Sequence, residues 1–466
     1  MPSRQDQLHS YQFMVQRVVG ALVMRETDPA QSPFRRAAGA TLASLLIALI
    51  GIGGSVVYGV FVGGGATKWK DSSVVIVEKE SGAQYVYVDN TLHPVLNYTS
   101  ALLIVGQVPK TVSVSRKSLE GQPRGVTLGI RDLPESLAPH NRLVSGGWTI
   151  CSQPRAGGGG AAQPQSTLLV GRTAPGGREL GDEGLLAEHP NGQLFLIWHN
   201  RRHLIENPDL VVSALTWGSQ RRVPVAPALL NALPAGTNLG EIRIPDAGEP
   251  SDAVEGAKIG EVFLVERQGG GGQYAVAKRD GLYNITEVQA NILLTSDVVK
   301  QGDETKLTQG QYGAMPKKGD LVPGNDAAAP AETPEMASAE GGVVCGDVPD
   351  DRGVQDIRVG ADMSGIAAPP ATSAQSPRGG TLADQVVLEP GRGVVVEAAA
   401  APGATGGAIS VVTDQGRRHP VTSGEVLNNL GYGAVKRVRM PSILVTLIPD
   451  GPALDPEKAR DRAGVQ

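Results

Sequence analysis

The chain has 466 residues and a formal net charge of −5, and it contains 61 glycines and 33 prolines but only 4% aromatic residues. Because it has no basic stripe and no long run of like charges, its composition argues against a nucleic-acid-binding protein and against an acidic tail. The glycine content is about twice the usual share of roughly 7%, which predicts short strands and many turns rather than long coiled coils.

An amphipathic helix is predicted in the cytoplasmic segment, residues 1–36. Apolar side chains recur there every three or four positions, which is the spacing of one helix face. They are Leu8, Tyr11, Val15, Val18 and Leu22. Such a helix ahead of a membrane anchor either lies on the membrane or docks on a partner. Because this terminus is too short to fold alone, we predict partner docking.

Residues 37–67 contain no Asp, Glu, Lys, Arg or His. A helix needs about 20 apolar residues to cross a hydrocarbon layer of roughly 30 Å. This stretch is longer, and lies later in the chain, than the apolar part of a removable secretory signal. We therefore predict an uncleaved transmembrane helix followed by an exit linker.

The basic residues around this helix predict its orientation. Five arginines precede the span, and only Lys68 and Lys70 closely follow it. Because basic residues are retained on the cytoplasmic side, the N-terminus is expected inside and the chain from residue 68 onward outside the cell membrane.

Four segments of the exported part share one pattern. Each has three strands, with His or Tyr at one fixed position of the third, and then a short helix in a β-β-β-α order. The equivalent positions are His93, His203, Tyr283 and His419. The predicted N-caps of the four helices are Asn97, Asn207, Thr286 and Thr422. The repeats are unevenly spaced, which argues against a solenoid.

The material between the repeats is β-prone and turn-rich, so we predict a central β domain flanked by the repeats. The predicted repeats cover residues 68–106, 181–218, 256–300 and 384–433. The central domain is assigned to residues 107–180 and 301–383, the connector to 219–255 and the C-terminal segment to 434–466. Residues 156–160 and 269–272 read as flexible loops, residues 324–340 and 366–380 as disordered or extended, and the chain after Pro449 as loose. The fold class is α+β, mainly β.

Cys151 and Cys345 both fall in the exported part. An even number of cysteines in an oxidising compartment favours a disulfide, which would staple the two parts of the central domain together. Two buried free thiols are the alternative, and metal binding by two cysteines without nearby histidines is less favoured.

No catalytic, cofactor or metal site is predicted. His199 and His203 have the spacing of a zinc-protease helix, but Asn200 stands where the catalytic Glu is needed and the segment reads as a hairpin. A position filled by His or Tyr alike is better explained by packing and hydrogen bonding than by metal ligation. The phosphate-binding pattern G-x-x-x-x-G-K-[ST] has no match in the sequence. The cluster of Asp347, Asp350 and Asp351 is expected to be a solvated loop.

Several stretches together carry a resemblance to a known family. They are DQLHSYQF (6–13), SGAQYVYV (81–88), LHPVLN (92–97), SALLI (100–104), PVAPALLNALP (224–234) and GPAL (451–454). With these stretches the chain resembles EccB, the single-pass core component of the actinobacterial type VII (ESX) secretion system. One departure is Gln16-Arg17, where the family commonly has paired arginines.

The resemblance implies a structural core subunit of a membrane complex that exports small helical WxG-type proteins. It also implies homo-oligomers and, as partners, a FtsK/SpoIIIE-like motor ATPase (EccC), a multi-span subunit (EccD) and further membrane subunits. The resemblance also implies that the part outside the membrane has four repeats, a central β domain and a disulfide, which is the architecture predicted here. Family members are also described as hydrolysing ATP, for which this sequence offers no recognisable residues. Two alternatives are a nucleotide hydrolase with a cryptic site and a cell-wall-binding repeat protein.

Overall fold

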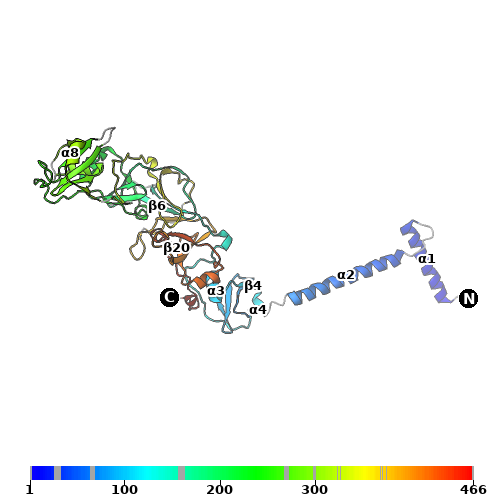
Figure 1. Ribbon diagram of the computed structural model, residues 1–466. Helices are drawn as coiled ribbons and strands as arrows, with labels where there is room; N and C mark the ends of the chain where they lie inside the picture. The colour runs from blue at the N-terminus through cyan, green and yellow to red at the C-terminus, as the bar shows by residue number, and fades with distance from the viewer. Residues whose placement is uncertain are drawn as a thin grey trace. The chain divides into compact units, whose positions relative to one another are not determined.

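The computed structural model separates the chain into two compact units, which are described independently. One unit holds Met1–Pro94 with Pro109–Gly125, and the other holds Val95–Val108 with Val126–Gln466. Figure 1 shows the chain coloured from its N-terminus to its C-terminus. The structure describes residues 3–25, 33–62, 69–155, 163–266, 272–297, 301–322, 324–325, 327–367, 369, 371–373 and 375–463. The predicted loop at 156–160, residues 269–271 of the predicted loop at 269–272, and the exit linker at 63–67 lie outside these ranges. The prediction is wrong for Gly272, which begins a strand (Gly272–Lys278).

Two helices come first in the chain (Figure 1). Helix α1 (Arg4–Met24) begins at a capping box in which Ser3 and Asp6 each bond the other's backbone N–H. Helix α2 (Pro33–Val62) contains one stretch, Ala37–Val57, that is long and apolar enough to cross a membrane, with a mean hydropathy of 2.2 and no buried part. A helix exposed along such an apolar surface is expected to lie in lipid. The two predicted N-terminal helices are therefore present.

The four repeats have one topology. Three consecutive strands form an antiparallel sheet, a helix follows, and a fourth strand then pairs parallel to the first. A short second helix comes next. The first two repeats contain β1 (Val74–Glu78), β2 (Gln84–Val88), β3 (Thr91–Pro94), α3 (Tyr98–Val105), β4 (Lys110–Val114) and α4 (Arg116–Leu119), then β8 (Leu185–Glu188), β9 (Leu194–Trp198), β10 (Arg201–Ile205), α5 (Pro208–Ala214), β11 (Val223–Pro224) and α6 (Pro227–Ala232).

Repeats 3 and 4 repeat this order. They contain β12 (Val262–Glu266), β13 (Gly272–Lys278), β14 (Gly281–Ile285), α7 (Glu287–Thr295), β15 (Thr305–Leu307), α8 (Gln309–Ala314) and β16 (Lys317–Asp320), then β20 (Gly393–Ala399), β21 (Ala408–Thr413), β22 (Arg418–Pro420), α9 (Gly424–Asn429), β23 (Val438–Pro441) and α10 (Ser442–Val445). The fourth strand of each repeat lies outside the predicted repeat boundaries, yet it pairs with the repeat's first strand. Repeat 3 adds a fifth strand, β16, which pairs parallel to β14. The predicted repeat boundaries therefore end too early.

Helix capping explains where the repeat helices begin. Asn97 accepts a hydrogen bond from the N–H of Ser100, and Thr286 forms a capping box with Gln289, as predicted. Asn207 is an N-cap without a side-chain bond. The prediction for Thr422 is wrong, because α9 starts after Ser423 and the Thr422 hydroxyl instead donates to the carbonyl of Leu454, 3.2 Å away.

The central sheet has six strands in the order β19-β6-β5-β17-β18-β7. They are β5 (Trp148–Pro154), β6 (Pro164–Leu169), β7 (Gly176–Glu179), β17 (Val344–Val348), β18 (Asp356–Ala361) and β19 (Gln385–Val387). Cys151 on β5 lies directly opposite Cys345 on β17, and the two form a disulfide. The predicted pairing is confirmed, and it joins chain segments 194 residues apart.

Buried side chains connect the central sheet to two repeats. One apolar cluster contains Trp148 and Ile150 of the central sheet, Leu229 of α6, Val394 of β20 and Leu444 of α10. A second cluster joins repeat 2 to helix α7 of repeat 3, where α5 and α7 are in contact. Burial of such surface stabilises a fold by about 25 cal/mol per Å². Repeats 2 and 4 are therefore packed into the core of the central domain.

The C-terminal segment is ordered through residue 463, so the prediction that it is loose is wrong there. Helix α11 (Pro456–Ala459) contacts α3, and the Arg460 guanidinium donates to the carbonyl of Ile104, 3.1 Å away. Figure 1 shows the C-terminus beside α3. The segment near 336, predicted as disordered or extended, is extended, because Met336 pairs with Gly184. Three short 3₁₀ turns complete the described elements: η2 (His140–Arg142), η3 (Trp217–Ser219) and η4 (Glu340–Gly342).

Candidate functional site

The repeat histidines are neutral packing residues where they are buried. His203 and His419 are both inaccessible to solvent. Their Nδ1 atoms lie 2.8 Å and 3.0 Å from the carbonyl oxygens of Thr237 and Pro452. Because a carbonyl only accepts, each Nδ1 carries the proton. Burial lowers the pKa of both imidazoles, so both rings are uncharged at neutral pH.

Each of these histidines lies against a glycine that the sequence analysis missed. A Cβ added to Gly236 would lie 2.2 Å from Cε1 of His203, and one on Gly451 would lie 2.3 Å from Cε1 of His419. In repeat 1 a Cβ on Gly125 would meet His93 at 2.2 Å. A glycine is therefore required wherever the repeat has His.

These glycines belong to a Pro-x-Gly-x-x-Leu motif at the end of three repeats. The motif occupies residues 123–128, 234–239 and 449–454. In repeat 2 it runs beside the third strand: the N–H of Arg202 donates to Pro234, and the N–H of Gly236 donates back to Arg202. The same pair of bonds links Arg418 to the motif in repeat 4. The motif thus adds one more strand-like segment to each sheet.

Repeat 3 differs at this position. Tyr283 lies on the same third-strand position, opposite Val276, but its ring is only partly buried and its hydroxyl donates to Asp280, 3.2 Å away. Its partner segment has the form Pro-x-x-Gly, in which Gly319 has a φ of +102°. The larger Tyr side chain and the shifted glycine occur together. The structure thus gives all four positions a packing or hydrogen-bonding environment.

Substituting Gly236 by alanine is expected to destabilise the exterior by about 1–3 kcal/mol, because the new methyl overlaps the buried His203 ring and the backbone has to move. The measurement is the denaturant midpoint of the full chain in detergent. Gly218→Ala in the same repeat is the control, since a Cβ there meets nothing within 4 Å. Equal midpoints for the two variants would contradict the packing role.

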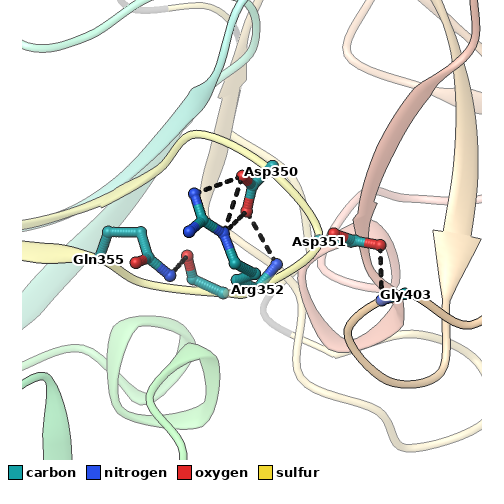
Figure 2. A network of polar contacts seen from close by, with 6 residues as sticks. Asp350, Asp351, Arg352, Gln355 and Gly403 are labelled. Carbon is teal, nitrogen blue, oxygen red and sulfur yellow. Dashed lines mark hydrogen bonds and ion pairs between the residues drawn. The ribbon is translucent and has the colours of Figure 1, made fainter.

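The loop between β17 and β18 joins the central sheet to two repeats (Figure 2). Its Asp351 carboxylate accepts from the N–H of Gly403 in a loop of repeat 4 and pairs with Arg439, both at 3.1 Å. On the repeat 2 side, the side-chain amide of Asn200 donates to the carbonyl of Gln355. The loop is therefore a junction between three sheets.

The expectation that the aspartates form a solvated loop is wrong for two of the three. The Asp347 side chain is 18% exposed and makes a two-point ion pair with Arg358, at 2.6 Å and 2.9 Å. The Asp351 side chain is 15% exposed. Asp350 is the most exposed of the three, at 41%, and its bonds to Arg352 hold its pKa below the usual value (Figure 2). All three acids therefore have structural partners at this junction.

The predicted docking stripe lies on α1. Its five members, Leu8, Tyr11, Val15, Val18 and Leu22, are all exposed. Met14, which is 64% exposed, lies three residues after Tyr11 and four before Val18 and so widens this stripe, whereas Phe13, 65% exposed, lies on the opposite face of the helix. Such a surface is typical of a helix that a partner or a membrane covers.

The comparisons with known proteins agree over almost the whole chain. The family model described as "Type VII secretion system ESX-1, transport TM domain B" matches residues 1–465. The chain is 28% identical to the ESX-3 secretion system ATPase EccB3 of Mycolicibacterium smegmatis, over 96% of this chain and 88% of that protein. It resembles the solved EccB3 dimer from the ESX-3 core complex with a TM-score of 0.66 and 26% identity, over 83% of this chain and 100% of that one. An intact ESX-5 inner membrane complex shares the fold, with a TM-score of 0.64 and 24% identity, over 100% of this chain and 96% of that one.

Proposed function

We propose that this chain, which belongs to the EccB family of type VII secretion transport proteins, is a structural core subunit of an ESX inner membrane complex. The observation that carries this function is the extent of the match. Family membership spans residues 1–465, so it includes the N-terminal helix, the span and all four repeats. The described part of the molecule is built from packed sheets and interlocked loops, as expected of a scaffold.

The partners of this scaffold are a FtsK/SpoIIIE-like motor ATPase (EccC), a multi-span subunit (EccD) and further membrane subunits. Helix α1 supplies the docking surface for them, because its apolar side chains are exposed and it precedes the span directly. One relative of known structure is a dimer from the ESX-3 core complex, which supports homo-oligomers here too. The exported cargo is small helical WxG-type proteins.

The N-terminus lies in the cytoplasm and the repeats lie on the opposite side of the cell membrane. The excess of arginines before the apolar stretch Ala37–Val57 of α2 supports this orientation. The Cys151–Cys345 disulfide supports it independently, because disulfides persist in oxidising compartments. The domain boundaries proposed for the exterior are those of the sequence analysis, extended to include the last strand of each repeat.

A second candidate is ATP hydrolysis, since the curated relatives are named ATPases. The sequence contains no G-x-x-x-x-G-K-[ST] loop to cradle the phosphates. Hydrolysis would therefore need a site of another kind. An ATPase assay on the purified full chain, free of the motor subunit, separates the two functions.

The scaffold is tested by extracting the tagged full chain in detergent and identifying what co-purifies by mass spectrometry. We expect a large complex that contains the motor ATPase and the multi-span subunit. The triple variant Leu8→Ser, Tyr11→Ser and Val15→Ser should lose one or both partners while remaining in the membrane, because α2 is intact. A matched control on the same helix replaces Gln5, Gln12 and Gln16 by Ala. Recovery of the wild-type chain alone would contradict the scaffold.

A further inference from the structure

Repeats 2 and 4 meet through their second helices, and a pocket lies beside the contact. Helices α6 and α10 follow the fourth strand of their repeats and contact each other. The pocket has a volume of about 320 Å³. Asn231 of α6 and Thr446 just after α10 both line it, and each precedes its repeat's Pro-x-Gly motif by three residues. The two repeats therefore present equivalent positions to one cavity.

Repeat 2 lacks an acidic side chain that pairs with the equivalent arginine in repeat 4. Arg202 and Arg418 are equivalent, since each precedes a buried repeat histidine. Arg418, which lines the pocket, pairs with Asp450 at 2.8 Å. The position equivalent to Asp450 in repeat 2 is Ala235. Arg202 accordingly makes no ion pair with any residue that the structure describes.

Arg202 is connected to the pocket by a neutral side chain. Its Nη1 lies 3.0 Å from Oδ1 of Asn231, and Nδ2 of Asn231 lies 3.1 Å from Oγ1 of Thr381, which also lines the pocket. Because Thr381 accepts that bond, its own proton is free to point at a ligand. Burial lowers the pKa of Arg202, which indicates that water does not fully solvate this charge.

The pocket wall adds one more cation. Arg378 lines the pocket, is exposed and has no ion pair within the described ranges. The site therefore combines three arginines, two in its lining and one behind Asn231, with the single carboxylate of Asp450. An excess of positive charge in a concave site favours an anionic ligand.

The remaining lining decides between kinds of anion. The backbone N–H groups of Gly379 and Gly380 already donate to Ser376, so they do not form a backbone nest of the kind that cradles phosphate. Apolar side chains lie next to the charges instead. Ile443 is 46% exposed at the pocket, and Leu447 and Ile448 are buried beneath it. An arginine fork with an apolar neighbour suits a carboxylate on a chain that also carries an apolar side chain.

We propose that this pocket binds a polypeptide segment in which a carboxylate lies next to an apolar side chain, with Arg378 and Thr381 holding the carboxylate and Ile443 contacting the apolar group. The segment comes from another protein chain. This inference stands apart from the secretion role, because it rests on the charges and contacts between repeats 2 and 4.

The test is calorimetric titration of the full chain in lipid nanodiscs with acetyl-Gly-Leu-Asp-amide and acetyl-Gly-Leu-Asn-amide. The Asp peptide should bind about tenfold more tightly than the Asn peptide, which corresponds to one charge-assisted hydrogen bond. Arg378→Gln should abolish that preference. Arg221→Gln, at another exposed arginine, is the control and should retain it. The unfolding midpoint of each variant is measured to confirm that it folds.

Three outcomes would overturn the proposal. The first is equal or undetectable binding of the two peptides by the wild-type chain. The second is an unchanged preference in Arg378→Gln. The third is competition by pyrophosphate at lower concentration than the Asp peptide, which would make the pocket a phosphate site.

Discussion

Replacing both cysteines by alanine is expected to lower the free energy of unfolding of the central domain by about 5 kcal/mol. The disulfide closes a loop between residues 194 positions apart, so its loss restores much conformational freedom to the unfolded chain. Cys151 on β5 and Cys345 on β17 are both fully buried. Their bond links the two chain segments that form the central sheet.

Denaturant unfolding of the full chain in detergent, followed by tryptophan fluorescence, measures this change, because Trp148 is buried on the same strand as Cys151. Wild-type protein in reducing buffer is the matched control and should lose a similar amount. If the free energy of unfolding fell by less than about 1 kcal/mol in both samples, the central sheet would not depend on the disulfide for its stability.

Replacing Asp347 by alanine is expected to destabilise the central domain by about 3–5 kcal/mol. The change leaves the Arg358 guanidinium, only 14% exposed, without its carboxylate. Two bonds from Arg358 to the carbonyls of Ala174 and Gly176, at 2.8 Å and 2.6 Å, hold it in the interior and prevent it from turning to water. The cost is therefore that of an unpaired buried charge rather than that of one lost contact.

The control for this prediction lies in the same loop. Asp350→Ala removes an ion pair with Arg352 whose partners are 41% and 62% exposed, and surface pairs contribute about 0–1 kcal/mol. The double variant Asp347→Leu with Arg358→Met should recover much of the loss, because no charge then remains buried. A similar loss for Asp347→Ala and Asp350→Ala in denaturant unfolding would contradict the distinction between buried and solvated pairs.

Local patterns were sufficient to predict several parts of this molecule. The two N-terminal helices, the three strands and helix of each repeat, and the cysteine pairing all follow from periodicity, capping residues and compartment. The prediction that the repeat histidines are packing positions rests on the His and Tyr exchange alone, and burial of His203 and His419 agrees with it. These features depend on residues that lie within a few positions of one another, or on only two cysteines.

The exposed apolar surface of α1 was predicted only in part. The stripe from Leu8 to Leu22 follows from helix spacing, and Met14 extends it at the same spacing, whereas the exposure of Phe13 on the opposite face does not follow from that pattern. The pocket between repeats 2 and 4 could not be predicted. Arg202 and Arg378 are far apart in the sequence, and Arg202 is linked to the pocket wall through Asn231 and Thr381 by long-range hydrogen bonds.

The sequence by itself determined the membrane anchor and the repeated unit. An uncharged apolar stretch predicts the first and the spacing of apolar residues predicts the second, and both are local properties of the chain. Only the tertiary structure decided where each repeat ends. Its fourth strand is as short as Val223–Pro224, too short to show a period, and it exists because the first strand of the repeat offers it hydrogen bonds. The burial of Asp347 and the requirement for Gly236 were decided in the same way, by the side chains of Arg358 and His203 that long-range folding brings against them.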